Sequence, residues 1–175
     1  MARRVCMDLL LSYYRTNLIY GKIPSMDFSR ITNNLFIGSM PYVEDYNRLR
    51  DLGVRLVINM RFDQRPFDDL HMPPLDFLWL RTFDNPLLLI PIRTLMRGAL
   101  AALETIREGG KVYTHCLHGR HRGVAMGAAV LVALGYPPED AIRLIKFQRS
   151  IADPDIFYIR NRILRFARQF QGIEY

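Results

Sequence analysis

The sequence contains very little cysteine, because only Cys6 and Cys116 occur among its 175 residues. Two cysteines cannot supply the disulfide framework of a small secreted domain, so free thiols in a reducing compartment are expected. The sequence also lacks a long apolar run. Near the N-terminus, Asp8, Ser12 and Arg15 interrupt the apolar residues before they reach the length of a signal peptide or a membrane-spanning helix. We therefore expect a cytoplasmic protein whose contact with a membrane, if any, is peripheral.

The chain also lacks repeats, low-complexity tracts and Ser/Gly-rich linkers. Half of its residues are hydrophobic, which at this length is enough to bury one core. Acidic residues are outnumbered, with 17 Asp and Glu against 24 Lys and Arg, which gives a formal net charge of +7. This excess favours anionic partners over cationic ones, although arginines on solvated surfaces would explain the charge without any partner.

Strand-like and helix-like segments alternate along the chain. The strand-like segments are short apolar or alternating runs at residues 33–41, 54–60, 75–81 and 111–116. The helix-like segments show helical periodicity at residues 1–20, 42–53, 92–108, 122–134, 139–149 and 154–170. Strands joined by helices of this length predict an α/β fold with a central, mostly parallel sheet of about four or five strands, flanked by helices on both faces.

This architecture also predicts where a site can form. In open α/β sheets, ligands bind in the crevice beyond the carboxyl ends of the strands. Three predicted loops follow strand-like segments, at residues 61–66, 82–86 and 116–123. Because parallel strands end at the same edge of a sheet, we expect these loops to lie close together.

The loop at 116–123 leads directly from a buried strand into an apolar helix. Consecutive backbone N–H groups and the positive end of the helix dipole can bind an anion at such a point. Gly119 lets the backbone curl around the anion, and Arg122 can donate two hydrogen bonds to it. The same surroundings favour the thiolate form of Cys116. The stretch therefore predicts an anion held against a nucleophile, the arrangement for attack on phosphorus.

The histidines in this stretch raise the alternative of a metal site. The nitrogen and sulfur side chains are those of His115, Cys116, His118 and His121. Residues this close in sequence cannot all converge on one ion, and the chain contains no second Cys/His pair. We therefore predict no metal and no organic cofactor.

The stretch "HCLHGRHR", residues 115–122, resembles the HCxxGxxR signature of cysteine-dependent phosphatases of the protein-tyrosine and dual-specificity class. "ITNNLFIGSMP" and "VRLVINMR" are similar to the opening and central strands of small dual-specificity phosphatases, so the resemblance runs from about residue 31 to residue 170. It implies a catalytic domain over residues 31–175. Residues 1–30 fall outside it, and we expect them to form an N-terminal helical extension packed on the domain.

The resemblance implies hydrolysis of phosphomonoesters. In that mechanism, Cys116 attacks phosphorus to form a cysteinyl-phosphate intermediate, and Arg122 holds the phosphate and the transition state. Asp84 matches the aspartate that protonates the leaving oxygen, with Asp63 in the neighbouring loop as its competitor. His115 matches a histidine that orders the loop, and it is not proposed as a base.

The remaining residues of the implied phosphate-binding loop are Leu117, His118, Gly119, Arg120, His121 and Gly123. Gly123 departs from the family pattern, which usually has Ser or Thr at this position to donate a hydroxyl hydrogen bond to the sulfur. If nothing substitutes for that bond, the hydrolysis of the phosphoenzyme would be slowed by about 1–3 kcal/mol of activation free energy.

The basic residues of this loop suit a substrate with a second phosphate or a dense anionic head group. The expected partner is accordingly a phosphorylated substrate, either a phosphoprotein or an anionic phospholipid. A dual-specificity or tyrosine protein phosphatase is the first hypothesis, and a phosphatase of phosphatidylglycerophosphate or phosphoinositides is the alternative. In the N-terminal segment, Arg3, Arg4 and Arg15 could contact an acidic membrane surface, although packing of an apolar helix stripe on the domain is the commoner explanation for such a segment.

Two further hypotheses remain. An RNA 5′-triphosphatase would share the histidine at position 118, but it would continue with Thr-Gly after Arg122. Aromatic and basic residues do not interleave as in a single-strand groove, so nucleic acid is not expected as a partner. The non-enzyme alternative is a phosphate-binding pseudophosphatase, which Gly123 favours and the presence of Cys116, Arg122 and Asp84 opposes.

Overall fold

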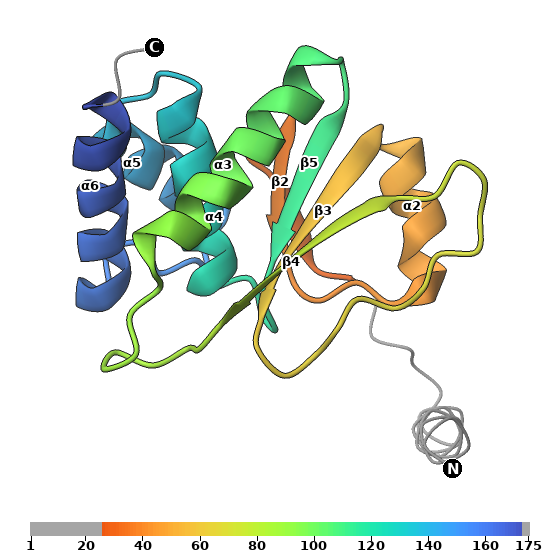
Figure 1. Cartoon of the computed structure of the whole chain (residues 1–175), viewed down its shortest axis with the longest axis horizontal. Coiled ribbons are helices and arrows are strands. Elements are labelled where there is room, and N and C mark those ends of the chain that lie inside the picture. Colours follow the sequence, from red (N-terminus) through yellow and green to blue (C-terminus); the bar gives the residue numbers. More distant parts are fainter. Residues whose placement is uncertain (1–25, 173–175) are drawn as a thin grey trace.

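A five-stranded sheet forms the centre of the fold in the computed structural model, which describes residues 26–172 (Figure 1). The strands are β1 (Phe28–Arg30), β2 (Leu35–Gly38), β3 (Val54–Arg61), β4 (Asp76–Thr82) and β5 (Lys111–His115). Their order across the sheet is β1-β2-β5-β3-β4. β1 pairs antiparallel with β2, and all other pairings are parallel, so the mostly parallel sheet predicted from the sequence is confirmed.

Helices cover both faces of this sheet, as predicted. On one face lie α3 (Ile92–Arg107), α4 (Arg122–Ala133), α5 (Pro138–Gln148) and α6 (Phe157–Gln171). The apolar helix α4 packs against the sheet and against the three other helices, and it forms the centre of the larger core. The other face carries the short 3-10 helix η1 (Val43–Asp45) and α2 (Tyr46–Asp51), over a smaller and more aromatic core.

β1 is a strand that the sequence analysis did not predict. Residues 28–30 belong to the range expected to form the N-terminal helical extension, but they form an edge strand of the sheet instead. The ring of Phe28 contacts those of Phe36 and Tyr113, with centroids 5.9 Å and 6.3 Å away, and this packing holds the strand in place. The helix expected over residues 1–20, together with Cys6, lies outside the described residues.

Two helix starts differ from the prediction. The helix expected from residue 42 begins as the 3-10 helix η1 before it becomes α2, and the chain leaves the helical conformation at Gly53, whose φ is 83°. The last helix begins at Phe157 rather than at residue 154. No helix between residues 26 and 172 has the length and apolar character needed to cross a membrane.

The three loops expected to meet do leave the sheet at one edge. β3, β4 and β5 run parallel, and the chain segments that follow them lie along the lower edge of the sheet in Figure 1. The loop after β5 enters α4 directly, while the loop after β4 runs along the side of the molecule to the start of α3. The candidate site lies at this edge.

Candidate active site

Carbonyl groups of the loop between β5 and α4 accept hydrogen bonds from backbone N–H groups outside the loop. The carbonyl of Leu117 accepts from the N–H of Met40 at 3.1 Å, and that of Arg120 accepts from the N–H of Asp153 at 3.0 Å. In contrast, the N–H groups of residues 117–121 donate to no acceptor in the described part of the chain. Successive N–H groups of this kind at the start of a helix are the donors that bind an anion.

Arg149, which follows the last residue of α5, fixes the outer side of this loop. Its side chain is buried, its Nε donates to the carbonyl of Gly119 at 2.9 Å, and its Nη2 donates to the carbonyl of His118 at 3.0 Å. The same Nη2 forms an ion pair with Asp27 at 2.8 Å. The sequence analysis gave no role to Arg149, because one arginine at the end of a predicted helix resembles its solvated neighbours. It is a positioning residue for the loop.

Gly119 is required where this loop passes the end of β2. Its φ is 65°, which disfavours a side chain, and a Cβ at this position would lie 2.4 Å from the carbonyl oxygen of Gly38. Any other residue would therefore push the loop away from the sheet. The close contact with β2 sets the curvature of the loop around Cys116.

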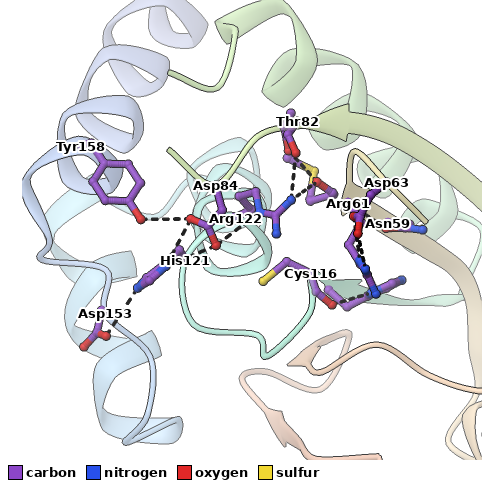
Figure 2. A network of polar contacts seen from close by, with 12 residues as sticks. Asn59, Arg61, Asp63, Thr82, Asp84, Cys116, His121, Arg122, Asp153 and Tyr158 are labelled. Carbon is purple, nitrogen blue, oxygen red and sulfur yellow. Dashed lines mark hydrogen bonds and ion pairs between the residues drawn. The ribbon is translucent and has the colours of Figure 1, made fainter. Parts of the chain in front are cut away.

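Cys116 and Arg122 lie side by side at the two ends of the loop (Figure 2). Cys116 is buried and forms no disulfide. Nη1 of Arg122 donates to the carbonyl of Thr82 at 2.8 Å and to that of Met60 at 3.3 Å, so the guanidinium is anchored to the ends of β4 and β3. Its Nε is buried and has no hydrogen-bond acceptor within residues 26–172. A buried guanidinium N–H in this position can bind an oxyanion.

Asp84 lies opposite Arg122, in the loop after β4 (Figure 2). Its carboxylate accepts a hydrogen bond from the hydroxyl of Tyr158 at 3.0 Å and lies 3.2 Å from Nδ1 of His121. It is also 3.5 Å from Nε of Arg122. Nε2 of His121 lies 3.6 Å from Asp153, so the imidazole bridges two carboxylates. The structure therefore brings the predicted acid to the predicted phosphate-binding arginine.

Asp63, the competing candidate for the acid, is paired differently. Its two oxygens accept from Nη2 and Nε of Arg61 at 2.6 Å and 3.1 Å. These hydrogen bonds, with the charges of Arg61 and Arg122, lower the pKa of Asp63. Asp63 is thus paired with Arg61, whereas Asp84 lies next to Arg122, which follows the loop that begins at Cys116, so the geometry favours Asp84 over Asp63.

Tyr158 is a site residue that the sequence analysis missed, because an aromatic residue in a predicted helix gives no signal of a distant partner. Burial raises the pKa of Tyr158, and the neighbouring charge of Asp84 raises it further, so the phenol stays protonated and donates. We expect Tyr158→Phe to lower kcat about three- to tenfold with little change in KM, because one hydrogen bond that orients the acid is lost. Steady-state kinetics with p-nitrophenyl phosphate measures this.

The matched control for this substitution is Tyr136→Phe, which removes a hydroxyl from a partly exposed tyrosine in the turn between α4 and α5. It should keep the kinetics of the wild type. A rise in KM at unchanged kcat in Tyr158→Phe would contradict a role that acts through Asp84.

His115 is buried at the end of β5, directly before Cys116. Burial lowers its pKa from 6.5 to about 4, and the charges of Arg61 and Arg122 act in the same direction. Its Nδ1 lies 3.0 Å from the carbonyl of Cys116. A carbonyl can only accept, so Nδ1 carries the hydrogen of the neutral imidazole. The side chain thus orders the loop backbone and is not charged at neutral pH.

The low pKa of His115 predicts that the protein loses stability as the pH falls from about 6.5 to about 4. In this range the unfolded chain binds a proton at His115 and the folded protein does not, which costs about 3 kcal/mol of unfolding free energy. Urea unfolding at a series of pH values measures the loss, and His115→Asn, which keeps a donor but does not titrate, should reduce it. The lowered pKa values of Asp63, Asp69 and Asp153 add a further loss of stability that begins only below about pH 5.

Gly123 packs α4 directly against the end of β5. A Cβ at this position would lie 3.0 Å from backbone carbons of His115 and 3.1 Å from the nitrogen of Cys116, so a side chain would fit only after a shift of a few tenths of an ångström. The hydroxyl of Thr114 donates to the carbonyl of Gly123 at 2.9 Å. The glycine that replaces the usual Ser or Thr at position 123 therefore lies where α4 packs closely on the end of β5.

The other predicted loop residues lie at the rim. Leu117 and His118 are exposed, and Arg120 forms an ion pair with Asp153 at 2.5 Å. Lys146 also lies 3.5 Å from Asp153, so part of the positive charge at the rim is balanced. Between residues 26 and 172, no three His, Cys, Asp or Glu side chains are grouped to hold a metal ion.

No family model matches the chain. It is 28% identical over 131 residues to dual specificity phosphatase 28 of Mus musculus, a match that covers 74% of this chain and 77% of the relative. It is also 28% identical over 153 residues to phosphatidylglycerophosphatase and protein-tyrosine phosphatase 1 of Homo sapiens, with 76% of this chain and 72% of the relative covered.

Two solved structures illustrate the likeness in fold. The crystal structure of human DUSP28 superposes with a TM-score of 0.73 at 23% identity, covering 82% of this chain and 95% of the other. The crystal structure of PTPMT1 in complex with PI(5)P superposes with a TM-score of 0.72 at 27% identity, covering 83% of this chain and 97% of the other. Both matches cover nearly the whole of the other chain, and the two cover similar shares of this chain, 82% and 83%.

Proposed function

The chain belongs to the superfamily of cysteine-dependent protein-tyrosine and dual-specificity phosphatases, and we propose that it hydrolyses phosphomonoesters through a cysteinyl-phosphate intermediate. One observation carries this proposal. The N–H groups of residues 117–121 donate to no acceptor in the described chain, and the buried Nε of Arg122 has no hydrogen-bond acceptor there, with the Asp84 carboxylate 3.5 Å away. These groups belong to the loop that begins at Cys116 and to the first residue of α4. Such a set of donors matches the oxygens of a phosphate group held over a thiolate.

The reaction has two steps. In the first, the thiolate of Cys116 forms a bond to phosphorus, the bond from phosphorus to the ester oxygen breaks, and Asp84 gives its proton to the leaving oxygen. In the second, a water molecule gives a proton to Asp84 and attacks phosphorus, the S–P bond breaks, and the thiolate and inorganic phosphate are released. Arg122 and the loop N–H groups stabilise the charge on the phosphoryl oxygens in both steps.

The pseudophosphatase alternative loses support from this geometry. A protein that only binds phosphate does not need a general acid beside its arginine. Here Asp84 lies 3.5 Å from Arg122 and accepts a hydrogen bond from Tyr158. We place the protein in the cytoplasm, where a free thiol at Cys116 stays reduced.

Phosphoproteins carrying phosphotyrosine, phosphoserine or phosphothreonine are the first proposed substrates, in keeping with the dual specificity phosphatase among the relatives. Anionic phospholipids are the second candidate. One relative is named as a phosphatidylglycerophosphatase, and one similar structure holds PI(5)P. Comparing kcat/KM on phosphotyrosine and phosphoserine peptides with kcat/KM on phosphatidylglycerophosphate and phosphoinositides decides between the two classes.

The proposed intermediate can be observed directly. Because Gly123 offers no hydroxyl to the departing thiolate, breakdown of the phosphoenzyme is expected to limit the rate. Rapid mixing with p-nitrophenyl phosphate should then give a burst of about one p-nitrophenolate per active site, followed by a slower steady rate. Mass spectrometry after an acid quench should find phosphate on Cys116, and turnover with no phosphate on that residue would contradict the mechanism.

A further inference from the structure

Three arginines line one hollow at the side of the active site. The hollow has a volume of about 470 Å³ and lies between β4 and the first turns of α3. Its lining residues are Trp79, Leu80, Arg81, Arg93, Thr94 and Arg97. All three arginines are exposed, and none forms an ion pair with an acidic residue of the described chain. Since no acidic residue lines the hollow, its charge favours an anion.

Aromatic rings hold one of these arginines without neutralising it. The guanidinium of Arg81 lies over the rings of Phe62 and Trp79, at 4.4 Å and 5.1 Å from their centroids. The indole N–H of Trp79 donates to the carbonyl of Arg61 at 2.7 Å, which fixes the ring. A stacked guanidinium keeps its N–H edges available, and these edges suit phosphate oxygens.

The loop that joins β4 to α3 exposes three consecutive leucines. Leu87, Leu88 and Leu89 are 88%, 52% and 41% exposed. This loop connects the strand of Arg81 to the helix of Arg93 and Arg97, so it joins the two elements that line the hollow (Figure 1). An apolar cluster of this kind on a loop in contact with water indicates an interaction surface.

From these contacts, we propose that the surface formed by Arg81, Arg93, Arg97 and Leu87–Leu89 binds an anionic phospholipid bilayer. The arginines contact lipid phosphates, and the leucines enter the apolar layer beneath them. A bilayer provides both environments side by side for a protruding loop, whereas an acidic protein would need a matching apolar pocket. Asp84 belongs to the same loop, so docking brings the catalytic edge to the lipid head groups, and in this respect the inference rests on the proposed function.

The single tryptophan of the sequence, Trp79, lines the hollow and reports on binding. The full-length protein is mixed with vesicles of phosphatidylcholine alone or of phosphatidylcholine with phosphatidylglycerol, and binding is measured by sedimentation. Brominated phospholipids in the same vesicles should quench the fluorescence of Trp79 when the surface meets the bilayer. The wild type should bind and be quenched only with phosphatidylglycerol present.

Two variants and one control separate the parts of the surface. The double variant Arg93→Gln/Arg97→Gln should bind about twentyfold more weakly, at roughly fivefold for each arginine near an anionic membrane. Leu87→Ser/Leu88→Ser should bind about tenfold more weakly and lose the quenching. Arg107→Gln, which removes one charge from the far end of the same helix, should bind like the wild type. Circular dichroism confirms that each variant is folded.

The opposite results overturn the proposal. Equal weakening by Arg107→Gln would assign the binding to net charge alone. Unchanged vesicle binding of Leu87→Ser/Leu88→Ser would overturn insertion of the leucines and leave only electrostatic attraction of the arginines. Vesicle binding requires no turnover, so a wild type that binds vesicles but leaves p-nitrophenyl phosphate intact supports docking and contradicts the proposed function. A wild type that hydrolyses this ester but does not bind vesicles overturns docking alone.

Discussion

Cys116→Ser should lower kcat for p-nitrophenyl phosphate about ten-thousandfold, to the limit of detection. The hydroxyl that replaces the thiol is not ionised at neutral pH and is a poor nucleophile toward phosphorus. The loop N–H groups and Arg122 stay in place, so the variant should still bind phosphate. Steady-state hydrolysis measures the first effect, and protection against thermal unfolding by added phosphate or vanadate measures the second.

The other cysteine of the sequence offers a matched control. Cys6→Ser makes the same chemical change at a cysteine to which the proposed mechanism gives no role, and it should keep wild-type activity. If the wild type and Cys116→Ser were equally inert while both bound phosphate, the protein would be a phosphate-binding pseudophosphatase. Residual turnover in Cys116→Ser equal to that of an active wild type would place the nucleophile elsewhere.

Asp84→Asn should lower kcat about a hundred- to a thousandfold for esters with a poor leaving group, such as phenyl phosphate. The amide cannot give a proton to the departing oxygen, so the loss depends on how much that oxygen needs one. With p-nitrophenyl phosphate, whose leaving group is stable as an anion, the loss should be several times smaller. The ratio of the two losses identifies a general acid, which a merely structural aspartate would not reproduce.

Asp63→Asn is the control for this experiment, because it makes the same change in the neighbouring loop, where the carboxylate pairs with Arg61. It should affect both esters alike and only slightly. A larger leaving-group dependence in Asp63→Asn than in Asp84→Asn would reverse the assignment of the acid.

The parallel strands could be predicted from the sequence, because buried strands are continuous apolar runs bounded by turns. β3 and β5 are of this kind. β1 could not, since its three residues, Phe28–Arg30, are only partly buried and depend on pairing with β2. A segment of this length has no periodicity of its own, so its conformation is decided by a partner strand rather than by local preference.

The centre of the site was predictable because the residues from Cys116 to Arg122 are close in sequence and form one turn from strand to helix. Asp84 was implied by the resemblance to the phosphatase family, and its place just after a predicted parallel strand agrees with a position at the site edge of the sheet. Arg149 and Tyr158 were not, because their contacts with Gly119 and Asp84 span 30 and 74 residues. Leu87, Leu88 and Leu89 lie between the predicted strand at 75–81 and the predicted helix at 92–108, but only the structure gives the exposure of their side chains.

The contacts of Arg149 couple two regions that otherwise share little. Its guanidinium binds the loop carbonyls on one side, and on the other it reaches Asp27 at 2.8 Å and the hydroxyl of Ser29 at 3.4 Å. Local unfolding of the first strand therefore frees the side chain that holds the catalytic loop. The rigidity of the active site therefore depends on an edge of the sheet that contains no catalytic residue, because the carbonyl groups of the catalytic loop share one guanidinium with the residues of that edge.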